Sequence, residues 1–264
     1  MTPLRKQSVA IFLLTCSSIA SLAQTPTPPP TQPQAPKAPL TVPFNPQPKP
    51  IPRTLILLDP AHGGPDTGAH LPNNLVEKDI TLAFAARLRA LLSSNNFAVI
   101  STRTSDPATL FTTDQRAEIA NHDRASVCLV LHATSSGSGI HLFTSSLTPP
   151  SSASRPTYLL HWDTAQAPSI PASRSLANDI GVALLQAKLP VTLSQSSVAP
   201  LDNLTCPAIA IELAPLANTN SDPTPVSDAA YQQRTAEAIA TALTNWRTNN
   251  ADGRTNSIPD GAAR

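Results

Sequence analysis

The sequence predicts an α/β fold: a three-layer domain in which a largely parallel, open sheet is flanked by helices on both faces. Short aliphatic runs alternate along the chain with longer segments of helical periodicity, which is typical of parallel sheets built from crossover connections. The run over 125–131 is so apolar that both of its faces must be covered. The run over 55–58 ends at Asp59-Pro60, and glycines force a turn directly after His62, so a buried strand stops there.

The remaining elements follow from periodicity and from helix-start signals. After the loop that carries His62, apolar residues from Ile80 to Leu92 recur at the spacing of one helical face. Thr113 or Asp114 is suited to cap the next helix. In chain order, we expect strands over 55–58, 97–100, 125–131, 140–143 and 206–212, and helices over about 74–92, 113–120, 173–188 and 228–247.

Residues 1–23 have the pattern of a signal peptide. Basic Arg5 and Lys6 precede an apolar segment too short to span a bilayer, and a small-x-small cleavage site follows. We therefore expect an exported protein, periplasmic or associated with the cell envelope, with no integral membrane span after signal removal. A short amphipathic helix of the mature protein is one alternative. A lipid anchor at Cys16 is another, which the poor fit of Thr15 to a lipoprotein processing site disfavours.

Composition divides the rest of the chain. Residues 24–52 are rich in Pro, Gln, Thr and Ala, so we expect a disordered spacer, with a Pro-rich recognition ligand as the alternative. The folded domain covers 53–248, and a flexible polar tail covers 249–264. Within the domain, 145–172 reads as a surface insertion over the sheet. Its Trp162 either pins the loop to the domain, which we favour, or contacts substrate.

Charge and aromatic content exclude a nucleic-acid-binding protein. The formal net charge is +1, only 13% of residues are charged, and no basic run is present. The electrostatic attraction that a phosphate backbone requires is therefore missing. Aromatic residues make up 4% of the chain, which also disfavours a stacking platform for single strands.

Two cysteines, Cys128 and Cys206, remain after the signal segment, and both lie in or beside apolar runs. In an oxidising compartment they could pair, but two buried free thiols fit the sequence equally well. A disulfide-dense scaffold is excluded.

Four polar side chains are expected at one edge of the sheet. Apolar strands end in His62, His132 and Glu212, and Glu77 lies in the first turn of the helix that follows the His62 loop. Carboxyl ends of parallel strands and the amino ends of the helices that follow them share one edge. Two histidines and one carboxylate leave a position open on tetrahedral zinc, and a second carboxylate can serve as general base. His62, Glu77 and His132 would be the ligands, and Glu212 the base.

Each of these residues has a purely structural alternative. His62 could cap a turn, and Asn74-x-x-Glu77 resembles a capping box that would occupy Glu77 at the helix end. Glu212 is harder to explain structurally, because an ionised carboxylate among apolar neighbours needs a partner. His70 is near enough to serve as a fallback ligand. The positions of the other histidines suggest that they face solvent: His122, His141 and His161.

An ordered set of motifs resembles the zinc-dependent N-acetylmuramoyl-L-alanine amidases. The resemblance covers about 54–246, and the set is specific although each motif alone is weak. The motifs are Leu57-Leu-Asp-Pro-Ala-His-Gly-Gly-x-Asp-x-Gly-Ala69, Glu77-Lys-Asp-Ile80, Thr102-Arg-x-x-Asp106, Gln115-Arg-x-x-Ile-Ala-Asn121, Leu131-His-Ala133 and Pro207-Ala-x-x-x-Glu212.

The resemblance implies a zinc ion on His62, Glu77 and His132, with Glu212 as the catalytic carboxylate. It implies peptidoglycan as the substrate, cut at the amide between N-acetylmuramic acid and the L-alanine of the stem peptide. Whether a partner protein activates the enzyme stays open. Arg103 and Arg116 match family positions too, and we interpret both as structural, pairing with Asp106 or with loop carbonyls.

The chain departs from the family pattern at three places. Ala61 and Ala133-Thr134-Ser135 replace a usual Gly and a usual Asn, and Ala214-Pro215 replaces Gly-Phe. If the family glycine adopts a left-handed conformation, alanine in its place costs about 1 kcal/mol. Two alternative functions therefore stay open: a catalytically degenerate peptidoglycan-binding protein, and a zinc peptidase acting on another cell-wall amide.

Overall fold

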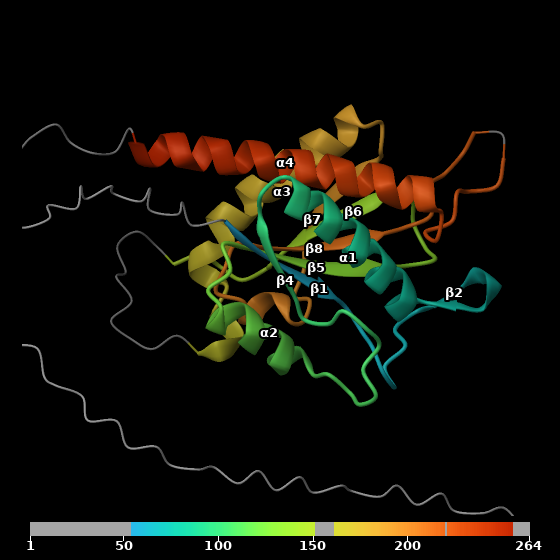
Figure 1. Cartoon of the computed structure of the whole chain (residues 1–264), viewed down its shortest axis with the longest axis horizontal. Coiled ribbons are helices and arrows are strands. Elements are labelled where there is room, and N and C mark those ends of the chain that lie inside the picture. Colours follow the sequence, from blue (N-terminus) through green and yellow to red (C-terminus); the bar gives the residue numbers. More distant parts are fainter. Residues whose placement is uncertain (1–53, 151–160, 220, 256–264) are drawn as a thin grey trace, which may run out of the picture. The chain divides into compact units, whose positions relative to one another are not determined.

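The computed structural model describes residues 54–150, 161–219 and 221–255 (Figure 1). The expected signal peptide at 1–23 and spacer at 24–52 lie outside this part, as does the middle of the insertion at 151–160. In the described residues, no helix combines the length and the apolar character needed to cross a membrane.

A six-stranded sheet forms the middle layer and is parallel except at one junction. From edge to edge, its strands are β4 (Ala98–Ser101), β1 (Leu55–Pro60), β5 (Val127–Ala133), β8 (Ala208–Leu213), β6 (Ile140–Thr144) and β7 (Val191–Gln195). β1 pairs in parallel with β4 and β5, and β5 pairs in parallel with β8. β6 runs antiparallel to β8, and β7 runs parallel to β6. The expected open, largely parallel sheet is confirmed.

Helices cover both faces of this sheet, as expected (Figure 1). One face carries α1 (Glu77–Ser94), α3 (Ile170–Gln186) and α4 (Ala229–Thr255), and α4 packs against both α1 and α3. The other face carries the short α2 (Thr113–His122). α2 begins with a capping box between Thr112 and Gln115, so the cap lies one residue before the expected Thr113.

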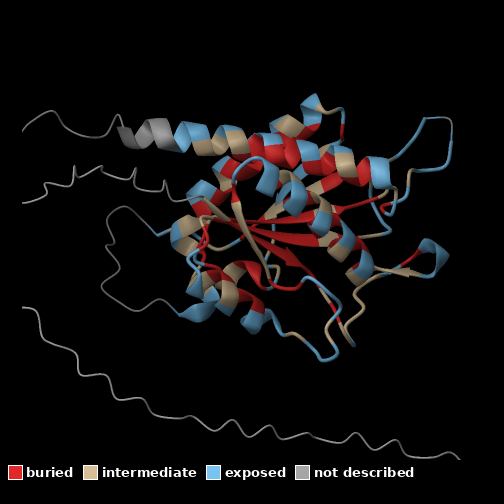
Figure 2. Ribbon diagram, viewed as in Figure 1, coloured by how far each residue is buried: buried red, intermediate tan, exposed pale blue. Residues whose placement is uncertain are grey.

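The central strands contribute alternate side chains to two separate cores. Leu129 and Leu131 of β5 pack with α1, α3 and α4, whereas Cys128 and Val130 pack on the side of α2. These strands are red along most of their length in Figure 2 because both faces are covered except near their carboxyl ends. This explains why the run over 125–131 is apolar without alternation.

The face that carries α2 opens toward the carboxyl ends of β5 and β8. The last residues that these strands place on this face are His132 and Glu212, and both are partly exposed. Two positions earlier on the same face, Val130 and Ala210 are buried. The fold therefore leaves one rim of the sheet where polar side chains can meet.

A small hairpin connects the His62 loop to α1. It consists of β2 (His70–Leu71), a 3₁₀ turn η1 (Pro72–Asn74) and β3 (Leu75–Val76). The N–H of Glu77 donates to the carbonyl of Ala69 at 2.9 Å, which closes the hairpin. The first residue of α1 is thereby brought beside the loop that follows β1.

Cys128 and Cys206 form a disulfide, with their Cα atoms 6.1 Å apart. This decides between the two states that the sequence left open. Cys128 lies on β5 and Cys206 lies two residues before β8, so the bond joins β5 to the segment that leads into β8, on the face of α2.

The described ends of the insertion contact the amino edge of the sheet rather than the open rim. The side-chain amide of Gln166 donates to the carbonyls of Leu204 and Cys206, at 2.6 and 2.8 Å, just ahead of β8. Trp162 is 60% exposed, so the prediction that it pins the loop is wrong. Gln166 does so instead, because its amide satisfies two buried carbonyls while its oxygen accepts from Ser173.

Two further differences concern the edge strand β7 and the end of α4. β7 is absent from the expected strands because it is a mostly exposed edge strand without a clear apolar face. α4 continues to Thr255, beyond residue 248, where we expected the tail to begin.

Candidate metal centre

His62 follows β1 in a left-handed backbone conformation, with φ 64°. Such a conformation is strained for a residue that carries a side chain. The surrounding contacts hold it: the guanidinium of Arg116 donates to the carbonyl of His62 at 2.7 Å, and Gly63 and Asp66 form a short antiparallel bridge. The turn therefore presents the imidazole at the open rim.

Arg103 and Arg116 stabilise this turn through hydrogen bonds to its backbone carbonyls. Both guanidinium groups donate to the carbonyl of Pro60, and Arg103 also donates to the carbonyl of Ala61 at 3.1 Å. Arg116 forms a buried ion pair with Asp59 at 2.7 Å. The structural interpretation of both arginines, with loop carbonyls as partners, is confirmed. Asp106 is not their hydrogen-bond partner; it pairs with Lys78 at 2.7 Å.

The departure at Ala61 has no backbone cost in this chain. Ala61 is buried and is not among the described residues with positive φ, whereas its neighbour His62 is. The penalty considered for an alanine in a left-handed conformation therefore does not arise.

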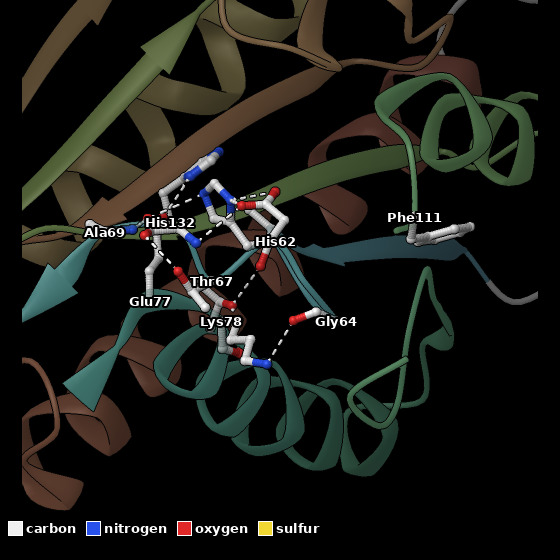
Figure 3. Close-up of polar contacts among 12 residues, drawn as sticks. His62, Gly64, Thr67, Ala69, Glu77, Lys78, Phe111 and His132 are labelled. Carbon is white, nitrogen blue, oxygen red and sulfur yellow. Dashed lines mark hydrogen bonds and ion pairs between the residues drawn. The ribbon is translucent and has the colours of Figure 1, made fainter. Parts of the chain in front are cut away.

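Asp66 fixes the orientation of the His62 ring. Nδ1 of His62 lies 2.9 and 3.0 Å from the two carboxylate oxygens of Asp66, so it carries the hydrogen. The opposite nitrogen, Nε2, then faces Oε2 of Glu77 at 3.2 Å (Figure 3). Hydrogen bonding to Glu77 raises the pKa of His62 above its ordinary value in spite of burial.

Glu77 is the first residue of α1, and its carboxylate is held from several sides. Oε2 accepts the N–H of Ala69 at 2.9 Å, and Oε1 accepts the N–H of Ala133 at 3.1 Å. Oε1 also lies 2.8 Å from Nδ1 of His132. Burial alone would raise the pKa of Glu77, but hydrogen bonds from His132 and His62 outweigh it and hold the pKa far below the usual range.

The capping-box alternative for Glu77 is wrong. The residue before α1 is Val76, and no side chain caps the helix. Asn74 adopts a positive φ inside the preceding hairpin and is not positioned as a helix cap. The carboxylate of Glu77 thus points at the two imidazoles rather than at its own helix end (Figure 3).

His62, Glu77 and His132 form one cluster whose ligand atoms lie within 4.8 Å of one another. The two imidazole rings meet edge to face, with centroids 5.5 Å apart. In a neutral His62 whose Nδ1–H bonds Asp66, the lone pair of Nε2 faces a carboxylate oxygen. Two lone pairs at this distance repel unless a cation lies between them or the ring is protonated. Nε2 of His132 is buried and unpartnered among the described atoms, which also fits a metal ligand.

Gly68 gives the cluster its space and was not singled out from the sequence. It has φ +65°, and a Cβ atom there would lie 2.6 Å from Cδ2 of His62 and 2.7 Å from Oε2 of Glu77. Only glycine fits this position. The first motif of the family resemblance contains this glycine. Only the packing against His62 and Glu77 shows why no other residue fits there.

Glu212 lies on the strand next to His132. The register of β5 and β8 pairs His132 with Glu212, so their side chains project from the same face of the sheet. Glu212 does not belong to the three-residue cluster. Its carboxylate instead meets Nδ1 of His141 at 2.8 Å.

The other histidines divide into two groups. His70 is exposed on β2 and is absent from the cluster in the described chain, so it is not needed as a fallback ligand. His122 and His161 are exposed, as expected. The expectation for His141 is wrong: only 18% of its side chain is exposed, because β6 runs antiparallel beside β8 and brings it against Glu212.

Fold and site together define the class of protein. It is an α/β domain with a candidate metal centre of two histidines and a carboxylate at the carboxyl edge of its sheet. A family model, Amidase_3, N-acetylmuramoyl-L-alanine amidase, matches residues 56–245. The chain belongs to this family.

Curated relatives match over part of their length. Amidase AmiA of Salmonella typhimurium is 40% identical over 81 residues, which are 31% of this chain and 27% of that protein. The germination-specific amidase of Bacillus subtilis is 36% identical over 101 residues, which are 31% of this chain and 40% of that protein. The chain thus spans less than half of these relatives.

Solved structures share the fold. Ami1 of Mycobacterium smegmatis superimposes with a TM-score of 0.58 at 19% identity, covering 74% of this chain and 97% of that one. The catalytic domain of CwlV from Bacillus (Paenibacillus) polymyxa has a TM-score of 0.55 at 23% identity, with 74% and 98% covered.

Proposed function

We propose that the chain is a zinc-dependent peptidoglycan hydrolase that cleaves the amide between N-acetylmuramic acid and the L-alanine of the stem peptide. The observation that carries this proposal is the His62–Glu77–His132 cluster, which lies one strand from Glu212 at the open rim. Membership of the amidase family supports the choice of bond.

His62, Glu77 and His132 would hold the zinc ion, since imidazole nitrogens and a carboxylate oxygen are its usual ligands. Zinc bound there supplies a Lewis acid that polarises a carbonyl and lowers the pKa of water. Asp66 keeps the His62 ring in the tautomer whose Nε2 is free to bind. Two backbone N–H groups keep the Glu77 carboxylate pointed at the imidazoles.

Glu212 would act as the general base. One carboxylate oxygen accepts a proton from the attacking water, whose oxygen bonds to the lactyl carbonyl carbon. As the C–N bond breaks, Glu212 returns the proton to the departing alanine nitrogen. The products are a muramoyl carboxylic acid and a peptide with a free amino terminus.

We also propose that the protein acts in the cell envelope after export. The signal-peptide pattern of residues 1–23 supports this location, and peptidoglycan lies outside the inner membrane.

Glu212→Gln tests the proposed chemistry. The substitution keeps the size of the side chain but removes the base, so release of stem peptides from purified sacculi should fall about 100- to 10,000-fold. Bound zinc, measured by elemental analysis, should be unchanged. Glu118→Gln makes the same change on the exposed face of α2 and should leave the rate unchanged.

Three results would contradict the proposal. Full activity of Glu212→Gln with its metal retained would remove Glu212 from the mechanism. Sacculus binding by the wild-type protein without new alanine amino termini would indicate a binding protein. Mass spectrometry of the digested muropeptides would reveal cleavage of a different amide.

A further inference from the structure

His141 and Glu212 form a side-chain pair at the rim of the sheet. Nδ1 of His141 lies 2.8 Å from Oε1 of Glu212. The two residues are directly opposite each other in the antiparallel register of β6 and β8, so both project from the face that holds His132. The side chains are 18% and 29% exposed. The pair is therefore partly shielded from water but open enough for a substrate to reach Glu212.

The imidazole of His141 is fixed by its surroundings. Gly137 lies against the ring: a Cβ atom at this position would come within 2.6 Å of Cε1 of His141. The ring of Phe143 also meets it edge to face, with centroids 6.4 Å apart.

The loop that carries Gly137 is itself fastened to the core. Gly139 donates to the carbonyl of Pro215 and accepts the N–H of Ala214, at 3.1 and 2.9 Å. The buried hydroxyl of Tyr231 lies within hydrogen-bonding distance of the carbonyls of both Gly139 and Ala214. The loop that packs against the ring of His141 is thus fixed by hydrogen bonds to the residues that follow β8.

Glu212 depends on this ring for its orientation. Among the residues that the structure describes, no other side chain forms a hydrogen bond with its carboxylate. A carboxylate with one oxygen held by a donor keeps the second oxygen free to accept a proton. Without the donor, the side chain can rotate among other rotamers, and a base displaced by about 1 Å can lose about 100-fold in rate.

We propose that His141 is a positioning residue for the reaction: its Nδ1–H holds Oε1 of Glu212 and thereby aims the other oxygen at the attacking water. This inference rests on the proposed function, in which Glu212 is the base. His141 acts through Glu212 and lies outside the His62–Glu77–His132 cluster.

The test compares His141→Leu with His141→Asn. The two side chains have the same shape and nearly the same size, but only asparagine can donate a hydrogen bond from the position of Nδ1. With a soluble muramoyl peptide as substrate, kcat of the leucine variant should fall about 10- to 100-fold while KM stays within about twofold. The asparagine variant should recover most of this loss, and zinc content should equal that of the wild type in both.

His122→Ala is the matched control, because His122 also pairs through Nδ1 with a carboxylate, that of Asp123, but on the exposed surface. Its kcat should be unchanged. Circular dichroism and melting temperature establish that each variant is folded. If the leucine variant does not fold, His141→Ala replaces it in the same comparison.

The outcomes separate this inference from the function on which it rests. If Glu212→Gln is inactive but His141→Leu retains the wild-type kcat, the inference is overturned and the proposed function stands. Equal loss in the asparagine and leucine variants also overturns it, because the donor would then be irrelevant. Full activity of Glu212→Gln overturns the proposed function itself.

Discussion

At the scale of single residues, the cluster is built from strained or sterically restricted positions. His62 has φ 64°, and a Cβ atom at Gly68 would overlap both His62 and Glu77. These positions persist because Asp66, Arg116 and the neighbouring backbone groups constrain the same loop. The site is therefore shaped before any ligand arrives, which reduces the reorganisation that binding would require.

Gly68→Ala should abolish stable zinc binding while the domain stays folded. The added Cβ would overlap His62 and Glu77, so the two ligands cannot keep their present places. Metal content after gel filtration, together with circular dichroism, checks the prediction. Gly181→Ala, inside α3, is the control, since its Cβ would meet only the flexible ends of Leu193, at 3.2 Å, and of Leu142, at 4.0 Å. Zinc at full occupancy in Gly68→Ala would refute the prediction.

Most of the candidate site residues are visible in the sequence, because strand ends and helix starts mark His62, His132, Glu212 and Glu77. His141 is not visible in this way. It lies in a short strand with alternating pattern, which reads as a side chain facing solvent. Its role depends on β6 running antiparallel to β8, and strand direction is not encoded in a run of five residues.

At the scale of elements, α1 and the loop after β4 are joined by one ion pair. Lys78, in the first turn of α1, donates to Oδ2 of Asp106 at 2.7 Å and to the carbonyl of Gly64 at 2.9 Å. The other carboxylate oxygen of Asp106 accepts the N–H of Gly64 at 2.7 Å. Three segments that are distant in sequence therefore meet beside the His62 turn. Figure 3 shows the contact between Lys78 and Gly64.

This pair predicts a stability change in acid. The hydrogen bonds from Lys78 and Gly64 hold the pKa of Asp106 below its ordinary value. The contribution is thus present above the ordinary aspartate pKa of about 4 and is lost as pH falls through the lower folded-state pKa. Melting temperatures of the wild type and Asp106→Asn, measured between about pH 7 and pH 2, should differ at neutral pH and converge in acid. A constant difference would contradict the assignment to ionised Asp106.

The helices and the central strands were predictable, since each has a length and periodicity that only one structure satisfies. The edge strand β7 was not, because four of its five residues are exposed and it buries no apolar face. The helix α2 begins at Thr113 as expected, but its cap is Thr112 rather than Thr113 or Asp114, because Thr112 and Gln115 form a reciprocal cap. Such a cap needs the right backbone angles as well as the right residues.

At the scale of the whole molecule, the disulfide connects positions 78 residues apart in the chain. It links β5 to the segment before β8 within the core on the α2 side of the sheet. The loop that it closes includes β6, α3 and β7. Since the disulfide lies toward the amino ends of β5 and β8, it supports the sheet without taking part in the rim where the cluster lies.

Cys128→Ala combined with Cys206→Ala should lower the free energy of unfolding by about 3–5 kcal/mol, because a long loop in the unfolded chain is no longer closed. Urea unfolding followed by circular dichroism measures the loss. A reducing agent should lower the stability of the wild type by a comparable amount and leave the double variant unchanged. Equal stability of the two proteins would refute the prediction.

The sequence alone determined the fold class, the order of the main elements and the four residues expected at one edge, because burial periodicity and strand ends are local properties. The tertiary structure decided which of these residues touch. It brought Glu77 between two imidazoles, paired Glu212 with His141, joined the cysteines and placed the described ends of the insertion at the opposite edge. These contacts depend on strand order and direction, which are set by the packing of the whole chain and not by any one segment of it.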